Sequence, residues 1–554
     1  MRTHWAATLL ASSGLLGASA AHNTTGYDYI VVGGGPSGII SAERLSAANK
    51  KVLLLERSPV GPTVGTGASH YSLQWNDTLT AIDVPGLSFD IGNFPQWNDY
   101  ICTDTDGTAA CILGGGVTVN YMVFVHPPDR DFNDKWPVGW KWPDVAPGAQ
   151  RLYARNPGSS VPSEDGRLYD QAAYGTLSTF FDNLNWTAVD MSARRNEKFQ
   201  TYSHPVWNVK DAKRAGPLRT YLPLALQRKN FSLRMGSLVT RLLRAGSRVT
   251  GVEVVNAITN ATESIPLAPG GKVILSAGAL HSPRILFNSG IGPRAQIATA
   301  QKSGIAVPPA HEWIDLPVGK SLMDHPIFSI VVKTKNGTFN ALDAAAILNG
   351  TATNDIAAYE QDNGGVLTQG KHRLIFFTSN VASDGHTRYY QGSCTPTAEG
   401  VVTITAYMTH GLTSKGELGL DTNQRTTITK SPYLQTAGDR EAAALFIQSM
   451  VDAINAPGSG LQLVQYTNTS AILGSLTAGI HYAGTTKMGT DDGRFNHGTA
   501  VVDTNTKVYG MDNLYIVDGG IHPDLASGNN QAIIMVVAEN AVERILAQDR
   551  FLSK

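Results

Sequence analysis

Cysteine is scarce in this chain, which has only three among its 554 residues: Cys102, Cys111 and Cys394. Neither a C-x-x-C nor an H-E-x-x-H motif occurs, so the sequence predicts no metal site. An excess of one charge sign is also missing, because the formal net charge at pH 7 is −1. A chain without a basic excess is not typical of proteins that bind nucleic acid or anionic membranes.

Long hydrophobic runs are absent beyond the first residues of the chain. No later segment has the roughly 18 consecutive apolar residues that a membrane-spanning helix needs. Residues 1–20 combine a basic start, an apolar stretch at 6–17 and small residues at the end, the pattern of a secretory signal peptide. We therefore expect a secreted, extracellular protein that does not enter the membrane.

Asn-x-Ser/Thr sequons support export, because they are acceptors for N-glycosylation in secreted proteins. They stand at Asn23, Asn76, Asn185, Asn230, Asn260, Asn336, Asn349 and Asn468. In the same compartment, Cys102 and Cys111 bracket a polar loop and could close a short disulfide ring. Two buried thiols are the alternative, and Cys394 then stays unpaired.

A glycine-rich turn follows the first apolar, β-branched run of the mature chain. Residues 29–32 predict a short buried strand, and residues 33–38 (GGGPSG) fit G-x-G-x-x-G before a helical pattern. In this motif Gly33 permits the tight turn, Gly35 lets the backbone approach a pyrophosphate, and Gly38 lets helix pack on strand. The order of strand, glycines and helix predicts a dinucleotide site.

An acidic residue completes this motif. Glu56 directly follows the next apolar run, residues 52–55, where a carboxylate should accept hydrogen bonds from ribose hydroxyls. Outside the cell a freely dissociating nicotinamide would be diluted away. The fingerprint therefore favours a tightly held prosthetic group, and FAD is the obvious candidate because its ADP half binds the same motif.

The rest of the chain divides into two kinds of segment. Strand patterns at 238–243, 249–255, 272–275 and 513–517, with a helix at 531–546, suit the dinucleotide-binding unit. Short alternating runs such as 401–408 instead suggest an antiparallel sheet. The predicted fold class is α/β, a Rossmann-like FAD-binding domain with a discontinuous α+β substrate domain built on an antiparallel sheet. The predicted boundaries are 1–20 for the signal peptide, 21–129, 215–310 and 471–554 for the FAD-binding domain, and 130–214 and 311–470 for the substrate-binding domain.

Three tryptophans stand close together, at Trp136, Trp140 and Trp142. They could form a platform on which a sugar stacks. A buried aromatic cluster beside Pro137 is the interpretation we favour.

Several longer segments resemble the glucose–methanol–choline (GMC) oxidoreductase family over essentially the whole mature length. Besides the fingerprint with Glu56, they are residues 110–120, 278–292, 316–325 and 481–538. Within the family, the loop between Cys102 and Cys111 and the runs 489–494 and 500–503 are most similar to the flavin domain of fungal cellobiose dehydrogenase. The resemblance implies an FAD-dependent dehydrogenase acting on CH–OH donors.

The resemblance also implies the reacting groups. His481 takes the position of the base that removes the hydroxyl proton, while hydride passes to flavin N5. Imidazole suits this task because its unperturbed pKa is near 6.5, as is usual for histidine. Asn529 takes the second position and would hold the substrate oxygen, and a shift of one residue would put Asn530 there instead. The implied partners are an alcohol or saccharide substrate and an external electron acceptor.

Further residues are implied as cofactor contacts. Gly115 should let the backbone approach the isoalloxazine, and Asn120 should lie near the flavin ring. Val239 would contact adenine through its backbone, and Asp518 would lie near the ribityl chain and pyrophosphate. Because position 119 is valine and residues 110–120 contain no histidine, a non-covalent FAD is expected.

Two other reactions stay open at this point. An alcohol oxidase would pass the electrons to oxygen and release hydrogen peroxide. A lyase or cyclase would keep FAD on the same fold without net redox chemistry, because a fold alone does not decide the reaction.

Overall fold

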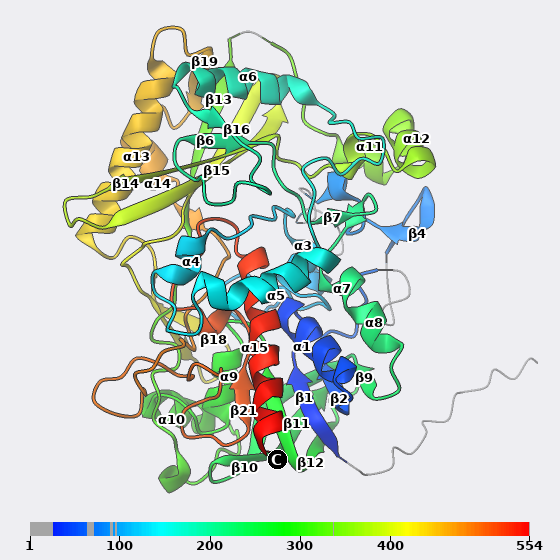
Figure 1. The fold of residues 1–554 in the computed structure, drawn as a ribbon, viewed down its shortest axis with the longest axis vertical. Coiled ribbons are helices and arrows are strands. Elements are labelled where there is room, and N and C mark those ends of the chain that lie inside the picture. Colours follow the sequence, from blue (N-terminus) through cyan, green and yellow to red (C-terminus); the bar gives the residue numbers. More distant parts are fainter. Residues whose placement is uncertain are drawn as a thin grey trace, which may run out of the picture.

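The computed structural model describes residues 26–63, 71–88, 92, 94, 97–335 and 337–552. Two sheets lie toward opposite ends of the long axis of the molecule (Figure 1). The signal-peptide prediction and the sequons at Asn23 and Asn336 fall outside the described residues.

The first sheet contains the predicted fingerprint strand at its centre. Its order is β10-β11-β12-β1-β2-β9, with β21 paired to β12. Strands β1, β2, β9 and β21 and the last part of β12 pair parallel with one another, as expected for a Rossmann-like sheet, while β10 and β11 form the predicted antiparallel hairpin. The strands are β1 (Tyr27–Val32), β2 (Val52–Leu55), β9 (Phe231–Arg234), β10 (Ser237–Ala245), β11 (Arg248–Asn256), β12 (Thr262–Leu275) and β21 (Leu514–Ile516).

Strand β12 serves two partners along its length. Its first part, residues 262–266, pairs antiparallel with β11, and its last part, residues 272–275, pairs parallel with β1. The sequence pattern predicted only this last part, because its apolar run is the one that is buried on both faces.

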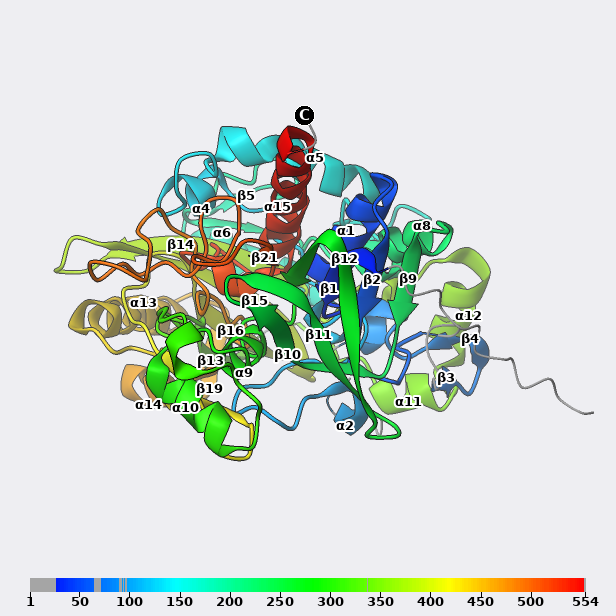
Figure 2. The ribbon, with the colours of Figure 1, turned by 90° about the horizontal axis from the view of Figure 1, so that it is seen from below.

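Helices cover this sheet. The helix α1 (Pro36–Ala47) starts directly at the glycine turn and lies beside the long C-terminal helix α15 (Gln531–Leu552), blue and red in Figure 1. The others nearby are α5 (Trp142–Arg155), α7 (Pro217–Thr220), α8 (Leu222–Leu226), α9 (Ser282–Asn288) and α10 (Arg294–Lys302). Figure 2 shows the same domain from below, with β10, β11 and β12 toward the viewer.

The second sheet is antiparallel except at one edge, as predicted for its class. Its order is β19-β13-β16-β15-β14-β6-β5, with β20 paired to β13, and only β5 and β6 run parallel. The strands are β5 (Thr187–Ala188), β6 (Thr201–Ser203), β13 (Pro326–Thr334), β14 (Leu374–Val381), β15 (Thr387–Ala398), β16 (Val401–Met408), β19 (Leu461–Gln465) and β20 (Thr477–Ala478).

The two faces of this sheet differ in chemistry. One face carries buried apolar residues, such as Phe328, Ile404 and Phe376, in a core with α6 (Gln171–Asn183) and α13 (Ala437–Asn455). The opposite positions on β15 and β16 are mostly polar and include Gln391, Ser393, Thr395, Thr403, Thr405 and Tyr407. Alternation along each strand therefore gives a polar face directed away from the α13 core.

Smaller elements connect the two sheets. They are β3 (Ser72–Leu73), β4 (Asn76–Thr80), β7 (Val209–Lys210), β8 (Lys213–Arg214), β17 (Glu417–Leu420), β18 (Thr426–Lys430), α2 (Trp97–Tyr100), α3 (Gly116–Val119), α4 (Asp129–Asn133), α11 (Ala344–Leu348), α12 (Thr353–Asp362) and α14 (Thr469–Gly474). Across the described ranges, we find no helix with the length and apolar character needed to cross a bilayer.

The tryptophans form a buried cluster rather than a platform. Trp136 and Trp140 are 1% and 0% exposed, and their rings stack with centroids 5.3 Å apart. They belong to the same core as β1 and α15, together with residues of α5. The domain boundaries themselves stay a prediction.

Candidate active site

The glycine turn after β1 leaves no room for side chains at two positions. Gly33 has φ +104°, and a Cβ there would lie 2.5 Å from the carbonyl oxygen of Ser276. A Cβ on Gly38 would lie 1.9 Å from the carbonyl oxygen of Gly33, so helix and turn touch through backbone. Gly35 caps α1 without a side-chain hydrogen bond, and Pro36 is the first helical residue. The free N–H groups and positive dipole end of α1 suit a bound phosphate.

Glu56 closes the wall beside this turn. Its Oε2 accepts a hydrogen bond from the backbone N–H of Gly34 at 2.9 Å, and its Oε1 accepts one from Ser58 at 2.8 Å. Burial raises the pKa of Glu56, and these backbone bonds oppose that rise. Each carboxylate oxygen has a second lone pair, so Glu56 can still accept from a ligand hydroxyl.

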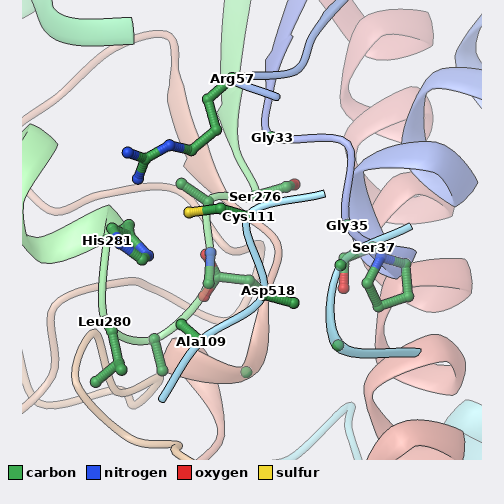
Figure 3. A pocket seen from close by; sticks show the side chains of 18 of the residues that line it. Gly33, Gly35, Ser37, Arg57, Ala109, Cys111, Ser276, Leu280, His281 and Asp518 are labelled. Carbon is green, nitrogen blue, oxygen red and sulfur yellow. The ribbon is translucent and has the colours of Figure 1, made fainter. Parts of the chain in front are cut away.

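A cavity of about 280 Å³ lies beside this turn, and its lining also includes Ile480, Tyr482 and Asn530. Seven predicted cofactor contacts line it: Gly33, Gly35, Glu56, Gly115, Asn120, Val239 and Asp518. Gly38 does not line it and instead packs under the turn. In Figure 3, Gly35 and Ser37 lie on one side of this space, and Asp518, Ser276 and His281 lie opposite.

The cavity wall holds polar atoms that the protein leaves unsatisfied. Ser37 Oγ and Ser276 Oγ are buried, and neither has a hydrogen-bond partner within the described part of the chain. Gly278 has φ +86°, and a Cβ placed on it would meet nothing within 4 Å, so its backbone faces open space. Asp518 holds this segment by accepting from the N–H of Gly278 at 2.9 Å. An elongated ligand with phosphate and hydroxyl groups, such as FAD, fits these donors and acceptors.

The predicted disulfide is present between Cys102 and Cys111, and Cys394 is free and buried. Within the bridged loop, Asp104 pairs with Arg57 at 2.9 Å and with Arg284 at 2.8 Å. The two sulfurs lie close to Asp104 and His281, and these four side chains are of types that could hold a metal ion. Cys102 and Cys111 are joined in the disulfide, and Asp104 pairs with the two arginines. Three of the four side chains therefore already have partners.

The predicted base lies next to residues that line this cavity. Ile480, Tyr482 and Asn530 line the cavity, whereas His481 and Asn529 lie directly beside these lining residues. His481 Nε2 is 3.3 Å from Asn529 Nδ2. Asn530 instead donates from its Nδ2 to the backbone carbonyl of His481 at 3.2 Å. Of the two asparagines, Asn529 is the one whose side chain meets the imidazole.

A buried carboxylate holds the backbone of this segment. Asp324 accepts hydrogen bonds from the N–H groups of His481 at 2.6 Å and Ile480 at 3.1 Å, and from the hydroxyl of Tyr433 at 2.6 Å. Ile480 has φ +60°, a conformation that a β-branched residue rarely adopts. Asp324 therefore stabilises a strained turn that presents His481.

The orientation of the Asn529 amide follows from an unambiguous donor. The backbone N–H of Asn529 donates to Gln391 Oε1 at 3.1 Å, so the Nε2 of Gln391 is left to donate to Asn529 Oδ1 at 2.7 Å. Asn529 must then turn its Nδ2 toward His481. An N–H donor at that distance requires a lone pair on His481 Nε2.

The second nitrogen of His481 meets another imidazole. His481 Nδ1 is 2.9 Å from His325 Nδ1. With a lone pair on its Nε2, neutral His481 carries its proton on Nδ1. This Nδ1–H donates a hydrogen bond to Nδ1 of His325. Burial lowers the pKa of His481 to about 4 and lowers that of His325 well below its usual range, so both rings are neutral near pH 7.

Comparison with known proteins gives the family. Two profiles of the family described as GMC oxidoreductase match residues 27–327 and 413–538. The chain belongs to the GMC oxidoreductase family. As a member it is an FAD-dependent oxidoreductase acting on CH–OH donors, as the sequence predicted.

Individual relatives of this GMC oxidoreductase are distant but cover nearly all of it. The chain is 25% identical to a 5-(hydroxymethyl)furfural oxidase of a Methylovorus species, over 94% of this chain and 99% of that one. It is 26% identical to human mitochondrial choline dehydrogenase, over 95% and 91%, and 25% identical to the chloroplastic fatty acid photodecarboxylase of Chlamydomonas reinhardtii, over 94% and 91%.

Solved structures share the fold. A formate oxidase of Aspergillus oryzae matches with a TM-score of 0.75 and 19% identity, covering 96% of this chain and all of that one. A fungal aryl-alcohol oxidase matches with a TM-score of 0.70 and 18% identity, covering 95% and 99%.

The sequence predicted residues for both parts of this candidate site but not the residues that support them. Asp324 and His325 form the D-H pair at the end of the family-like segment 316–325. The resemblance implied no role for either residue. Gln391 and Tyr407 lie within ordinary alternating strands, and no sequence signal distinguishes them. Tyr407 stacks on His481 with ring centroids 5.8 Å apart.

Proposed function

We propose that this GMC oxidoreductase is a secreted dehydrogenase that oxidises a hydroxyl group of a sugar or another alcohol. The observation that supports it best is the pair of His481 Nε2 and Asn529 Nδ2, 3.3 Å apart, beside the cavity that suits FAD. Bound FAD would supply the hydride acceptor for such an oxidation. The rest of the chemistry falls to the protein.

His481 is the proposed base. The lone pair on its Nε2 faces the place where a substrate hydroxyl would replace the contact with Asn529, and the pKa near 4 keeps that nitrogen unprotonated at neutral pH. Asn529 then donates from Nδ2 to the substrate oxygen and fixes its direction. His325 accepts a hydrogen bond from the Nδ1–H of His481 and so keeps the imidazole in the reactive tautomer.

Non-covalent FAD is part of the proposal. Residues 110–120 offer no histidine, and Cys111 is engaged in the disulfide. The retained cofactor and the absence of a covalent bond can be tested together, because acid precipitation would release a yellow, non-covalent flavin into the supernatant. The likeness to cellobiose dehydrogenase and an external electron acceptor other than oxygen also belong to this proposal.

Secretion is supported by residues 1–20 and by the position of several sequons. Asn185, Asn260, Asn349 and Asn468 are exposed, so a glycan could be attached to each. Asn230 is different, because its Nδ2 donates to the carbonyls of Ser46 at 2.8 Å and Lys50 at 2.7 Å. Glycopeptide mass spectrometry should find glycans at exposed sites and an unmodified Asn230.

The decisive experiment is anaerobic mixing of the purified flavoprotein with a panel of sugars and alcohols. Bleaching of the oxidised flavin absorbance supports alcohol oxidation. Product formation without any bleaching would instead support a non-redox lyase or cyclase and refute the dehydrogenase. Rapid return of colour on admitting air, with one hydrogen peroxide per turnover, would identify an oxidase.

A further inference from the structure

Lys371 is a half-buried cation that lies just before β14 and faces an aromatic ring. Its Nζ is 3.4 Å from the centre of the Tyr121 ring. Within the described ranges, no carboxylate forms an ion pair with it, and the neighbouring Arg373 takes the nearby Asp170 at 2.6 Å. Burial lowers the pKa of Lys371 to about 8, and no neighbouring acid opposes this effect.

Other cations whose pKa burial lowers are matched by an acid in the described part of the chain. The pairs are Lys198 with Asp131, Arg214 with Asp83, Arg244 with Glu312, Lys272 with Asp549, Arg284 with Asp104, Arg373 with Asp170, Lys415 with Asp524, Lys487 with Asp491 and Arg544 with Asp144. Lys371 departs from this rule. A partly buried ammonium without an anion is unfavourable, and the ring of Tyr121 compensates only part of that cost.

Tyr121 connects Lys371 to the reacting groups. It follows Asn120, which lines the FAD cavity, and 44% of its surface is exposed. Its phenol lies near that of Tyr407, and the Tyr407 side chain in turn hydrogen-bonds with Asn529. A chain of contacts through Tyr121 and Tyr407 therefore links Lys371 to His481, on which the Tyr407 ring stacks.

A row of polar side chains joins the two places. Gln391, which holds Asn529, shares its strand face with Ser393 and Thr395. Thr395 Oγ1 is 2.7 Å from His372 Nδ1, and the His372 ring lies 6.1 Å from that of Tyr121. The row runs along β15 from Asn529 toward Lys371, and no acidic side chain belongs to it.

We propose that Lys371 binds the carboxylate of the substrate, so that the enzyme prefers hydroxy acids, sugar acids included, over neutral alcohols. This inference rests on the proposed alcohol oxidation at His481. A carboxylate on the ammonium would form a charge-assisted hydrogen bond and supply the missing anion. The carbinol group of the same molecule would then extend along β15 toward His481 and Asn529.

The first test uses binding alone. The oxidised flavoprotein is titrated with acetate and benzoate and with their neutral amides, and the flavin difference spectrum reports binding. We expect the carboxylates to bind more tightly than the amides, and Lys371→Met to weaken carboxylate binding roughly 10- to 100-fold. Lys371→Arg should retain most of it. Lys333→Met, at an exposed lysine on β13, should change nothing.

The second test uses turnover. The kcat/KM ratio for gluconate over glucitol, whose chain is long enough to follow the row on β15, should fall by a similar factor in Lys371→Met. Equal binding of acids and amides by the native protein would overturn the inference. So would a shift of the flavin midpoint potential in Lys371→Met without a change in carboxylate affinity, because the ammonium would then serve the flavin. If carboxylates bind selectively but no alcohol bleaches the flavin, the proposed oxidation fails while the subsite stands.

Discussion

His325 lies behind His481 and faces it nitrogen to nitrogen, with 2.9 Å between the two Nδ1 atoms. Only one proton fits between them, so each ring dictates the tautomer of the other. His325 is fully buried, which prevents water from replacing it as the acceptor. The tautomer of the proposed base is thus supported by a residue that does not line the cavity.

Replacing His325 should separate this role from packing. His325→Phe removes the acceptor, and we expect the anaerobic flavin reduction rate to fall roughly 10- to 100-fold because His481 can take the wrong tautomer. His325→Asn offers a carbonyl oxygen to the same N–H and should retain more activity. Equal rates in both variants and the native enzyme would argue against a tautomer role.

His481→Ala should keep the yellow colour and lose most of the reduction rate. A general base contributes typically 10²- to 10⁴-fold, so a loss of roughly that size is expected in stopped-flow bleaching. The control is His497→Ala, because His497 is exposed. Unchanged bleaching in His481→Ala would show that another group removes the proton.

Asp324 should make the stability of the protein depend on pH. Burial raises its pKa from 3.8 to about 6, so the folded state binds a proton at a higher pH than the unfolded chain does. The native protein should therefore gain stability relative to Asp324→Asn as the pH falls from 7.5 through 6 to 4, by about 2 kcal/mol. Urea unfolding at pH 4 and 7.5 measures this difference, and a change of opposite sign would contradict it.

Gly38→Ala should abolish cofactor binding, because the added side chain would collide with the backbone of the glycine turn. The added Cβ would lie 1.9 Å from a carbonyl oxygen that cannot move without opening the turn. We expect a colourless protein destabilised by about 1–3 kcal/mol or more. The control is Gly175→Ala on α6, where an added Cβ meets nothing within 4 Å. This variant should stay yellow, and its free energy of unfolding should rise by up to about 1 kcal/mol. Flavin absorbance and thermal unfolding report both effects.

The sequence predicted individual strands, turns and helices but not the contacts between segments that lie far apart in the chain. The strands at 29–32 and 52–55, the glycine turn and the helix after it have patterns that short-range rules describe. The alternation at 401–408 predicted β16, yet it did not indicate that Tyr407 lies against His481. That contact depends on how the second sheet packs on the first, which is not encoded in any one segment.

The same limit applies to the supports of the base. Gln391 reaches Asn529, 138 positions later, and His325 reaches His481 across 156 positions. Contacts at that separation leave no periodic signal. The resemblance to a family located His481 and Asn529, but only the geometry of the amide and imidazole groups assigned their donors and acceptors.

The pairing of β12 with both β1 and β21 has a consequence for biosynthesis. The last part of β12 emerges from the ribosome long before its partner β21, by tens of seconds at ordinary rates of translation. During that interval its apolar edge has no lasting partner, and the segment with His481 and Asn529 has not yet been made. The nascent chain therefore needs protection from aggregation, and its chemistry can start only after synthesis is complete.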